Sequence, residues 1–94
     1  MVAIRFEAGW IEKQHRDSDG EWNPDMDEFA ASYHDSRVNA ELSAIKSSKA
    51  AGQCEWIQVT EQAFVKGEWA DRRIWVGDWD GLHDEIVSIG EELD

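Results

Sequence analysis

Apolar side chains alternate with other side chains along the first ten residues of the chain. The apolar positions are Val2, Ile4, Phe6, Ala8 and Trp10. Successive side chains of a strand point to opposite faces of its sheet, so this two-residue period predicts a strand with one buried face. A half-buried strand needs a sheet around it, and this requirement limits the fold more than any other feature of the chain.

A second strand signal covers the middle of the chain. The segments Cys54 to Phe64 and Glu68 to Val76 are rich in β-branched and aromatic residues, and Lys66-Gly67 between them supplies a turn. These features predict a β-hairpin. Strict alternation along its second strand would place four side chains on one face: Trp69, Asp71, Arg73 and Trp75.

Helical spacing follows Asn23-Pro24, a pair that fits an N-cap and the first residue of a helix. The apolar residues of this segment lie at positions i, i+3, i+4 and i+7, namely Met26, Phe29, Ala30 and Tyr33. A helix is therefore predicted to begin here, with acidic residues in its first turn.

Two later apolar stripes also predict helices. The first has Asp35 or Ser36 as its cap and Gly52 as its stop, and it is either a separate helix or the second half of a bent one. Its stripe consists of Val38, Leu42, Ile45 and Lys49. The last stripe follows Asp80 and consists of Leu82, Ile86, Ile89 and Leu93.

The elements occur in the order β-α(α)-β-β-α. We expect a compact α+β domain comprising residues 1–94, with an antiparallel sheet of three to four strands and two to three helices packed on one face. A chain of 94 residues is long enough for one hydrophobic core and too short for two lobes with a deep cleft.

Acidic residues are concentrated in two segments that contain no basic residue. The chain has 21 acidic and 9 basic residues and a net charge of −12. Thirteen of the acidic residues are Asp17, Asp19, Glu21, Asp25, Asp27, Glu28, Asp78, Asp80, Asp84, Glu85, Glu91, Glu92 and Asp94. Eight acidic and nine basic residues make up the remainder, so a nearly neutral domain carries two anionic segments.

Charge and composition exclude several classes of function. Phosphate contacts require Lys and Arg, and anionic lipids repel a negative protein, so direct binding to nucleic acid or to a membrane is not expected. The single Cys54 cannot form an intramolecular disulfide, and the N-terminus lacks a signal-peptide pattern, which favours the cytoplasm. We expect a basic protein as the partner.

An Asp-x-Asp-Gly tetrad occurs in each acidic segment, at residues 17–20 and 78–81. In such a sequence the Asp side chains can accept hydrogen bonds from nearby backbone amides, and Gly can adopt a positive φ. Both tetrads therefore predict turns.

The first acidic segment has oxygen-bearing side chains at the spacing of an EF-hand calcium loop. They are Asp17, Asp19, Glu21, Asn23, Asp25 and Glu28, at loop positions 1, 3, 5, 7, 9 and 12. Trp22 occupies the position that requires Gly, and Pro24 replaces the usual aliphatic residue. A calcium-binding or ligand-binding regulatory module that uses loop 17–28 remains the alternative interpretation. Zinc spacing, phosphate loops and catalytic motifs are absent, so we expect neither an enzyme nor a cofactor.

The leading hypothesis is an interaction protein whose acidic surface occupies a cationic nucleic-acid-binding site on another protein. An extended run from Asp17 to Glu21 would place same-face carboxylates about 6.6 Å apart, close to the phosphate spacing of DNA. Trp10 and Trp56 are expected in the core. The predicted partner-binding residues are Asp17, Asp19, Glu21, Trp22, Asp25, Asp27, Glu28, Asp78, Trp79, Asp80, Asp84, Glu85, Glu91 and Glu92.

In size, charge and mixed α+β pattern, the chain resembles the small acidic anti-defence proteins of phages and mobile elements, which include anti-CRISPR and DNA-mimic antirestriction proteins. Gly67-Glu68-Trp69-Ala70-Asp71 is similar to a segment of antirestriction proteins. The resemblance implies a stoichiometric inhibitor that acts in the cytoplasm of a host bacterium. We expect a monomer or a dimer, since an exposed Trp patch would permit dimerisation. Its target would be a CRISPR effector or a restriction enzyme.

Overall fold

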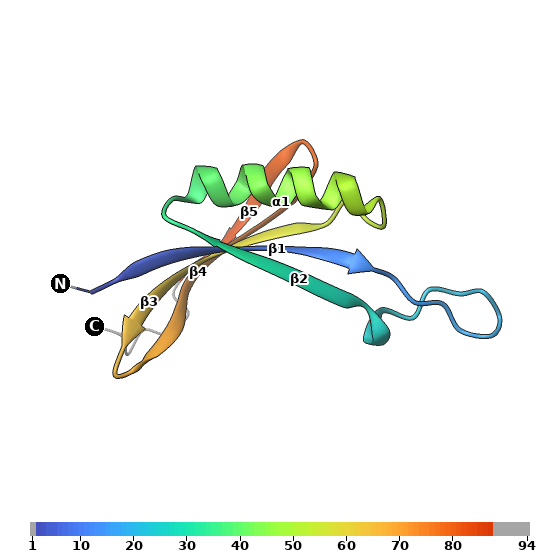
Figure 1. Cartoon of the computed structure of the whole chain (residues 1–94), viewed down its shortest axis with the longest axis horizontal. Coiled ribbons are helices and arrows are strands. Elements are labelled where there is room, and N and C mark those ends of the chain that lie inside the picture. Colours follow the sequence, from blue (N-terminus) through green and yellow to red (C-terminus); the bar gives the residue numbers. More distant parts are fainter. Residues whose placement is uncertain (1, 88–94) are drawn as a thin grey trace.

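The computed structural model describes residues 2–87 of the chain (Figure 1). Within these residues the elements are β1 (Ile4–Lys13), η1 (Pro24–Met26, a 3-10 turn), β2 (Glu28–His34), α1 (Arg37–Ala51), β3 (Ile57–Val65), β4 (Glu68–Asp78) and β5 (Gly81–Ile86). The strands form one antiparallel sheet in the order β2-β1-β3-β4-β5. The described residues therefore contain five strands and a single α-helix, and the expected three to four strands with two to three helices is wrong.

The strand predicted at the start of the chain is confirmed as β1, and it pairs on both sides. Ala8, at its centre, lies opposite Ser32 of β2 and Val59 of β3. Ala8 and Val59 are fully buried, as the two-residue period predicted for one face of the strand.

The predicted hairpin is confirmed as β3 and β4. Its two-residue turn places Lys66 at φ 53° and Gly67 at φ 84°, the backbone that suits the twist of the strands. Glu61 pairs with Arg73 and Gln62 pairs with Asp71, so β4 has one extra residue, a β-bulge, at this point. This extra residue reverses the alternation, so Trp69 and Trp75 lie on opposite faces and the predicted shared face is wrong.

The helix predicted after Asn23 is wrong beyond its first turn. Asn23 does cap a turn, since its side chain accepts a hydrogen bond from the amide of Asp25, but the turn ends at Met26. Phe29 to Tyr33 belong to β2, paired with β1. A strand along this edge satisfies backbone groups of β1 that a helix would leave without partners.

The predicted final helix is also wrong within the described residues. Gly81, at φ 134°, ends a tight turn, and β5 follows it as the antiparallel neighbour of β4. Leu82 pairs with Gly77, and Ile86 pairs with Ile74. The remaining positions of the predicted stripe, Ile89 and Leu93, lie outside the described residues.

α1 confirms the predicted second helix, and both of its ends match the sequence signals. The Ser36 hydroxyl accepts a hydrogen bond from the amide of Asn39 at 3.1 Å, and Gly52 is left-handed at φ 64°. Only part of the predicted stripe faces the sheet, however: Ile45 packs against the core, whereas Val38 and Leu42 are 56% and 60% exposed. The fully buried positions are instead Ala40, Ala44 and Ser48.

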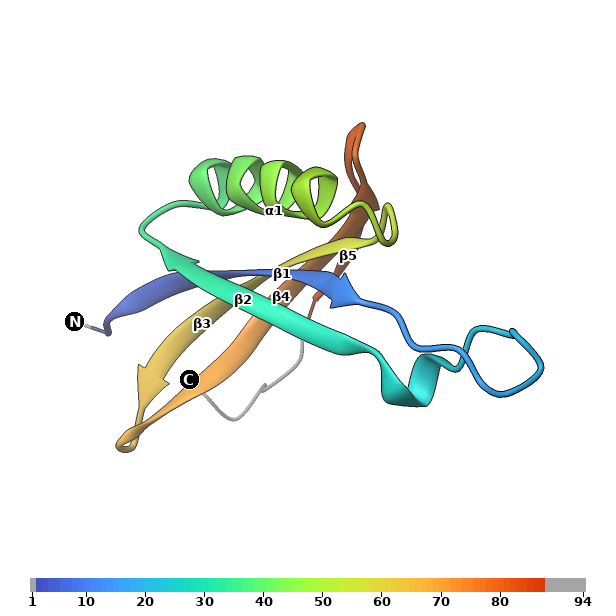
Figure 2. The ribbon, with the colours of Figure 1, turned by 45° about the vertical axis from the view of Figure 1, so that its right-hand side comes forward.

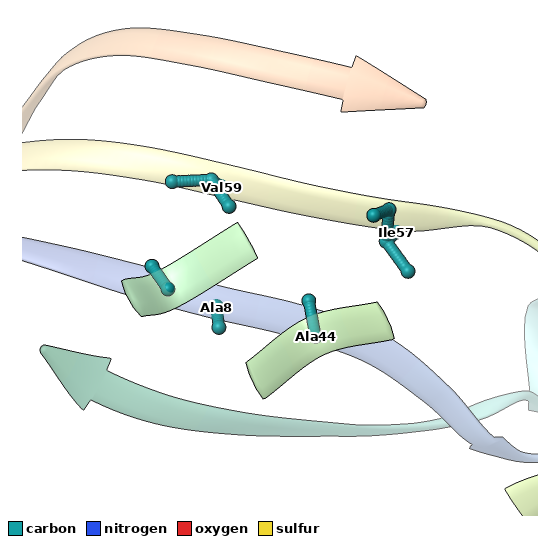
Figure 3. Close-up of a cluster of buried hydrophobic side chains, with 5 residues drawn as sticks. Ala8, Ala44, Ile57 and Val59 are labelled. Carbon is teal, nitrogen blue, oxygen red and sulfur yellow. The ribbon is translucent and has the colours of Figure 1, made fainter. Parts of the chain in front are cut away.

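The core lies where α1 crosses one face of the sheet (Figures 2 and 3). Its buried cluster consists of Ala8, Ala40, Ala44, Ile57 and Val59, with Phe6, Trp10, Ile45, Trp75 and Leu82 packed against it. Small side chains on both α1 and β1 allow the helix backbone to approach the sheet closely. Trp10 thus lies beside the core as expected, whereas Trp56 is outside this cluster.

Candidate functional site

Residues 14–28, the connection between β1 and β2 with the first residue of β2, extend beyond the end of the sheet (Figures 1 and 2). We call this segment the acidic arm. Its six acidic residues, all of them among the predicted binding residues, are Asp17, Asp19, Glu21, Asp25, Asp27 and Glu28. Five of these are exposed and Asp27 is half-buried, so the structure brings the first acidic segment together on one projection.

The tip of the acidic arm is a turn built on the first Asp-x-Asp-Gly tetrad. The Asp17 carboxylate accepts hydrogen bonds from the amides of Asp19 and Glu21, at 3.0 and 3.1 Å. Gly20 has a φ of 82°. The tetrad prediction is confirmed, but the extended run with DNA-like spacing is wrong, because the chain reverses direction at these residues.

Non-covalent contacts hold the two halves of the acidic arm together. Arg16 and Trp22 form an isolated β-bridge, and the Arg16 guanidinium donates to the carbonyl oxygen of Gly20 at 3.0 Å. At its base, the His15 imidazole contacts the Glu28 carboxylate at 2.7 Å. The arm is therefore a folded hairpin that presents its carboxylates in defined positions.

A small aromatic hollow lies at the base of the acidic arm. It has a volume of about 280 Å³, and we call it the aromatic hollow. Its lining residues are Ile11, Trp22, Pro24, Asp27, Phe29, Cys54 and Trp56. Phe29 and Trp56 meet edge to face with ring centroids 5.7 Å apart, and Trp22 remains 44% exposed.

The sequence pattern does not predict the aromatic hollow, because its walls come from distant segments. By sequence, Phe29 belongs to a predicted helical stripe and Trp56 to the predicted core. Register explains their actual place: Phe29 lies opposite Ile11, and this pair alternates with Trp10, which packs on the α1 face. Trp22, already a candidate, completes the hollow from the arm.

The second acidic segment is more dispersed. Trp79 is half-buried, and its indole N–H donates to the Ser48 hydroxyl at 2.8 Å, so this predicted binding residue fastens the β4–β5 turn to α1. Glu85 contacts Arg73 at 3.5 Å, and Asp80 and Asp84 are exposed. Glu91 and Glu92 lie outside the described residues.

Asp78 forms the second Asp-x-Asp-Gly turn. Its carboxylate accepts hydrogen bonds from the Asp80 amide at 2.8 Å and from His83 at 3.1 Å. The pKa of Asp78 is held below its usual range; the hydrogen bond from the Asp80 backbone amide is the largest cause, and the hydrogen bond from His83 is the second. The ionised Asp78 carboxylate therefore stabilises the fold at pH values above the pKa of the unfolded carboxyl. This stabilisation is lost as the pH falls through the lowered pKa of the folded state.

His83→Ala will therefore raise the pKa of Asp78 toward its usual range, because it removes the second-largest cause of the shift. NMR titration of the Asp78 carboxyl carbon measures this change. His34→Ala is the control, since His34 bonds Ser32 in β2. An unchanged Asp78 pKa in the His83 variant would contradict the assignment.

Two carboxylates at the EF-hand spacing make contacts within the acidic arm. Asp17 Oδ1 accepts hydrogen bonds from two backbone amides, and Glu28 Oε2 contacts the His15 imidazole. In residues 2–87, no group of three or more His, Cys, Asp or Glu side chains is arranged to hold a metal ion. The turn at Asp17 and the cap at Asn23 account for two of the six positions at this spacing.

Comparisons with known proteins return no match to a protein-family model, a curated protein or a solved structure. Among residues 2–87, no helix is both long and apolar enough to cross a membrane.

Proposed function

We propose that this protein binds a basic nucleic-acid-binding protein and occupies the surface that would otherwise contact phosphates. The observation that carries the proposal is the acidic arm, a braced hairpin that extends beyond the end of the sheet (Figure 1) and bears six acidic residues, five of them exposed. A cluster of charges of one sign attracts a protein surface of the opposite charge and accelerates the association of the two proteins.

Apolar side chains on and beside the arm complement its charge. Trp22, Met26 and Phe29 are 44%, 57% and 61% exposed. Tryptophan and other aromatic residues supply much of the binding energy in protein interfaces, whereas charges at an interface rim mainly set orientation and rate. An aromatic patch surrounded by carboxylates therefore suits a partner surface with cationic and apolar groups.

The mode of action that follows is stoichiometric blocking, not catalysis. The resemblance to anti-CRISPR and antirestriction proteins points to a CRISPR effector or restriction enzyme in the cytoplasm of a bacterium as the target. The turn at Asp17–Gly20 means that the proposal rests on clustered charge, without a straight row of phosphate-like carboxylates.

An affinity pull-down from a bacterial lysate that contains CRISPR and restriction complexes tests the proposal. The protein should retain a nucleic-acid-binding protein at low salt, and moderate salt or added nucleic acid should release it. EDTA is present throughout, so that calcium plays no part. Failure to retain any basic protein at low salt would refute the proposal.

A further inference from the structure

The aromatic hollow contains one carboxylate among several aromatic rings. Asp27 is half-buried, and its Oδ1 accepts a hydrogen bond from the Trp22 indole N–H at 2.7 Å. Among the hydrogen bonds of residues 2–87, none reaches the second carboxylate oxygen of Asp27. One oxygen thus positions the Trp22 ring, and the other is available to a ligand.

The charge and the chemistry of this hollow select for a cation. Rings of Trp and Phe attract cations to their faces, and a carboxylate beside them adds an ion pair. Asp25 and Glu28 flank Asp27 in the sequence and strengthen the negative potential. The indole N–H of Trp22, the donor that could hold an anion, is already used by Asp27.

We propose that the aromatic hollow binds a single cationic side chain, arginine or lysine, from the basic partner. This inference rests on the proposed function and gives its central contact. A volume of about 280 Å³ is below the range of drug-sized ligands and fits the end of one side chain. Arginine suits the site well, because a guanidinium stacks on aromatic rings and pairs with a carboxylate at its edge.

A short peptide pair tests the proposal without the partner. The probe is acetyl-Gly-Arg-Gly-amide, and the control contains citrulline, which has nearly the same shape without the charge. We expect the arginine peptide to bind with a Kd of about 1 mM and to shift the indole N–H resonances of Trp22 and Trp56. Equal shifts with the citrulline peptide would overturn the proposal.

Cys54 supplies an independent readout, because it lines the hollow and is the single cysteine of the chain. Saturation with the arginine peptide should slow alkylation of the Cys54 thiol severalfold, whereas the citrulline peptide should leave the rate unchanged. Unaltered alkylation together with unshifted indole resonances would show that the hollow does not take a cation.

Matched variants locate the site. Asp27→Asn keeps an acceptor for the Trp22 indole N–H and removes one negative charge. It should weaken binding of the arginine peptide by at least about fivefold. Asp25→Asn removes the same charge two residues away and should change the affinity by less than about twofold. Equal losses of affinity in the two variants would mean that the overall negative potential of the arm attracts the peptide, and would overturn the proposal.

Two results separate this inference from the proposed function. Partner capture that survives both Asp27→Asn and Phe29→Ala would refute the hollow as the central contact and leave the acidic arm as the binding surface. Peptide binding without capture of any basic protein would instead refute the proposed function and leave the cation site in place.

Discussion

Lysine substitutions at Asp19, Glu21 and Asp25 will weaken binding to the basic partner by about 100-fold at low salt. Each substitution removes an attractive pair and adds a repulsive one, at about 0.5 kcal/mol for each of the two effects, so three substitutions cost about 3 kcal/mol, which corresponds to about 100-fold. Asp19, Glu21 and Asp25 are exposed, so the fold should be retained. Isothermal titration of the captured partner at two salt concentrations measures the effect.

A control of equal charge keeps this test specific to the arm. Lysine at Asp35, Glu68 and Asp71 changes the net charge by the same amount at exposed positions that are away from the arm and outside the predicted binding residues. In the measurement at about 0.15 M salt, the control triple should lose less than about tenfold in affinity, because charges beyond the Debye length of about 8 Å at that ionic strength are screened. Equal losses would mean that net charge alone drives binding.

Gly77→Ala will destabilise the fold by at least about 2 kcal/mol. A Cβ at Gly77 would lie 2.0 Å from the Gly81 carbonyl oxygen and 2.7 Å from the Leu82 Cα. These are backbone atoms, so the clash is relieved only if β5 shifts away from β4. A domain of 94 residues has a total stability of roughly 5–14 kcal/mol, which makes this loss large.

Chemical denaturation measures the loss, and hydrogen exchange at Leu82 and Ile86 shows whether β5 detaches. Gly9→Ala is the matched control, since its Cβ would meet the Gln58 carbonyl oxygen at an ordinary 3.7 Å. That variant should be near neutral. Wild-type stability of Gly77→Ala would contradict the β4–β5 pairing.

The candidate site was only partly predictable from sequence. Charge clustering identified the acidic arm, because a run of like charges is visible without a fold. Trp22 was recognised from its acidic neighbours. The aromatic hollow was not recognised, since it exists only when the β1–β2 register places Phe29 opposite Ile11 and the chain after α1 brings Trp56 beside them.

The features that the sequence determined by itself are local. The alternation of β1 depends on a single strand, the caps at Ser36 and Gly52 bond within α1, and the Lys66-Gly67 turn joins adjacent strands. Each of these interactions spans a few residues, so its chemistry can be recognised in a short stretch of chain.

Contacts between distant segments determine that residues 28–34 and 81–86 form strands, and which face of α1 is buried. Phe29 and Tyr33 satisfy both a helical and an alternating spacing, and the exposed edge of β1 selected the strand. Likewise, the alanines of α1 face the sheet, because small side chains allow the helix to pack closely over Ala8. Leu42 is left exposed to solvent. Such outcomes depend on which surfaces meet across the fold, and a local pattern does not contain that information.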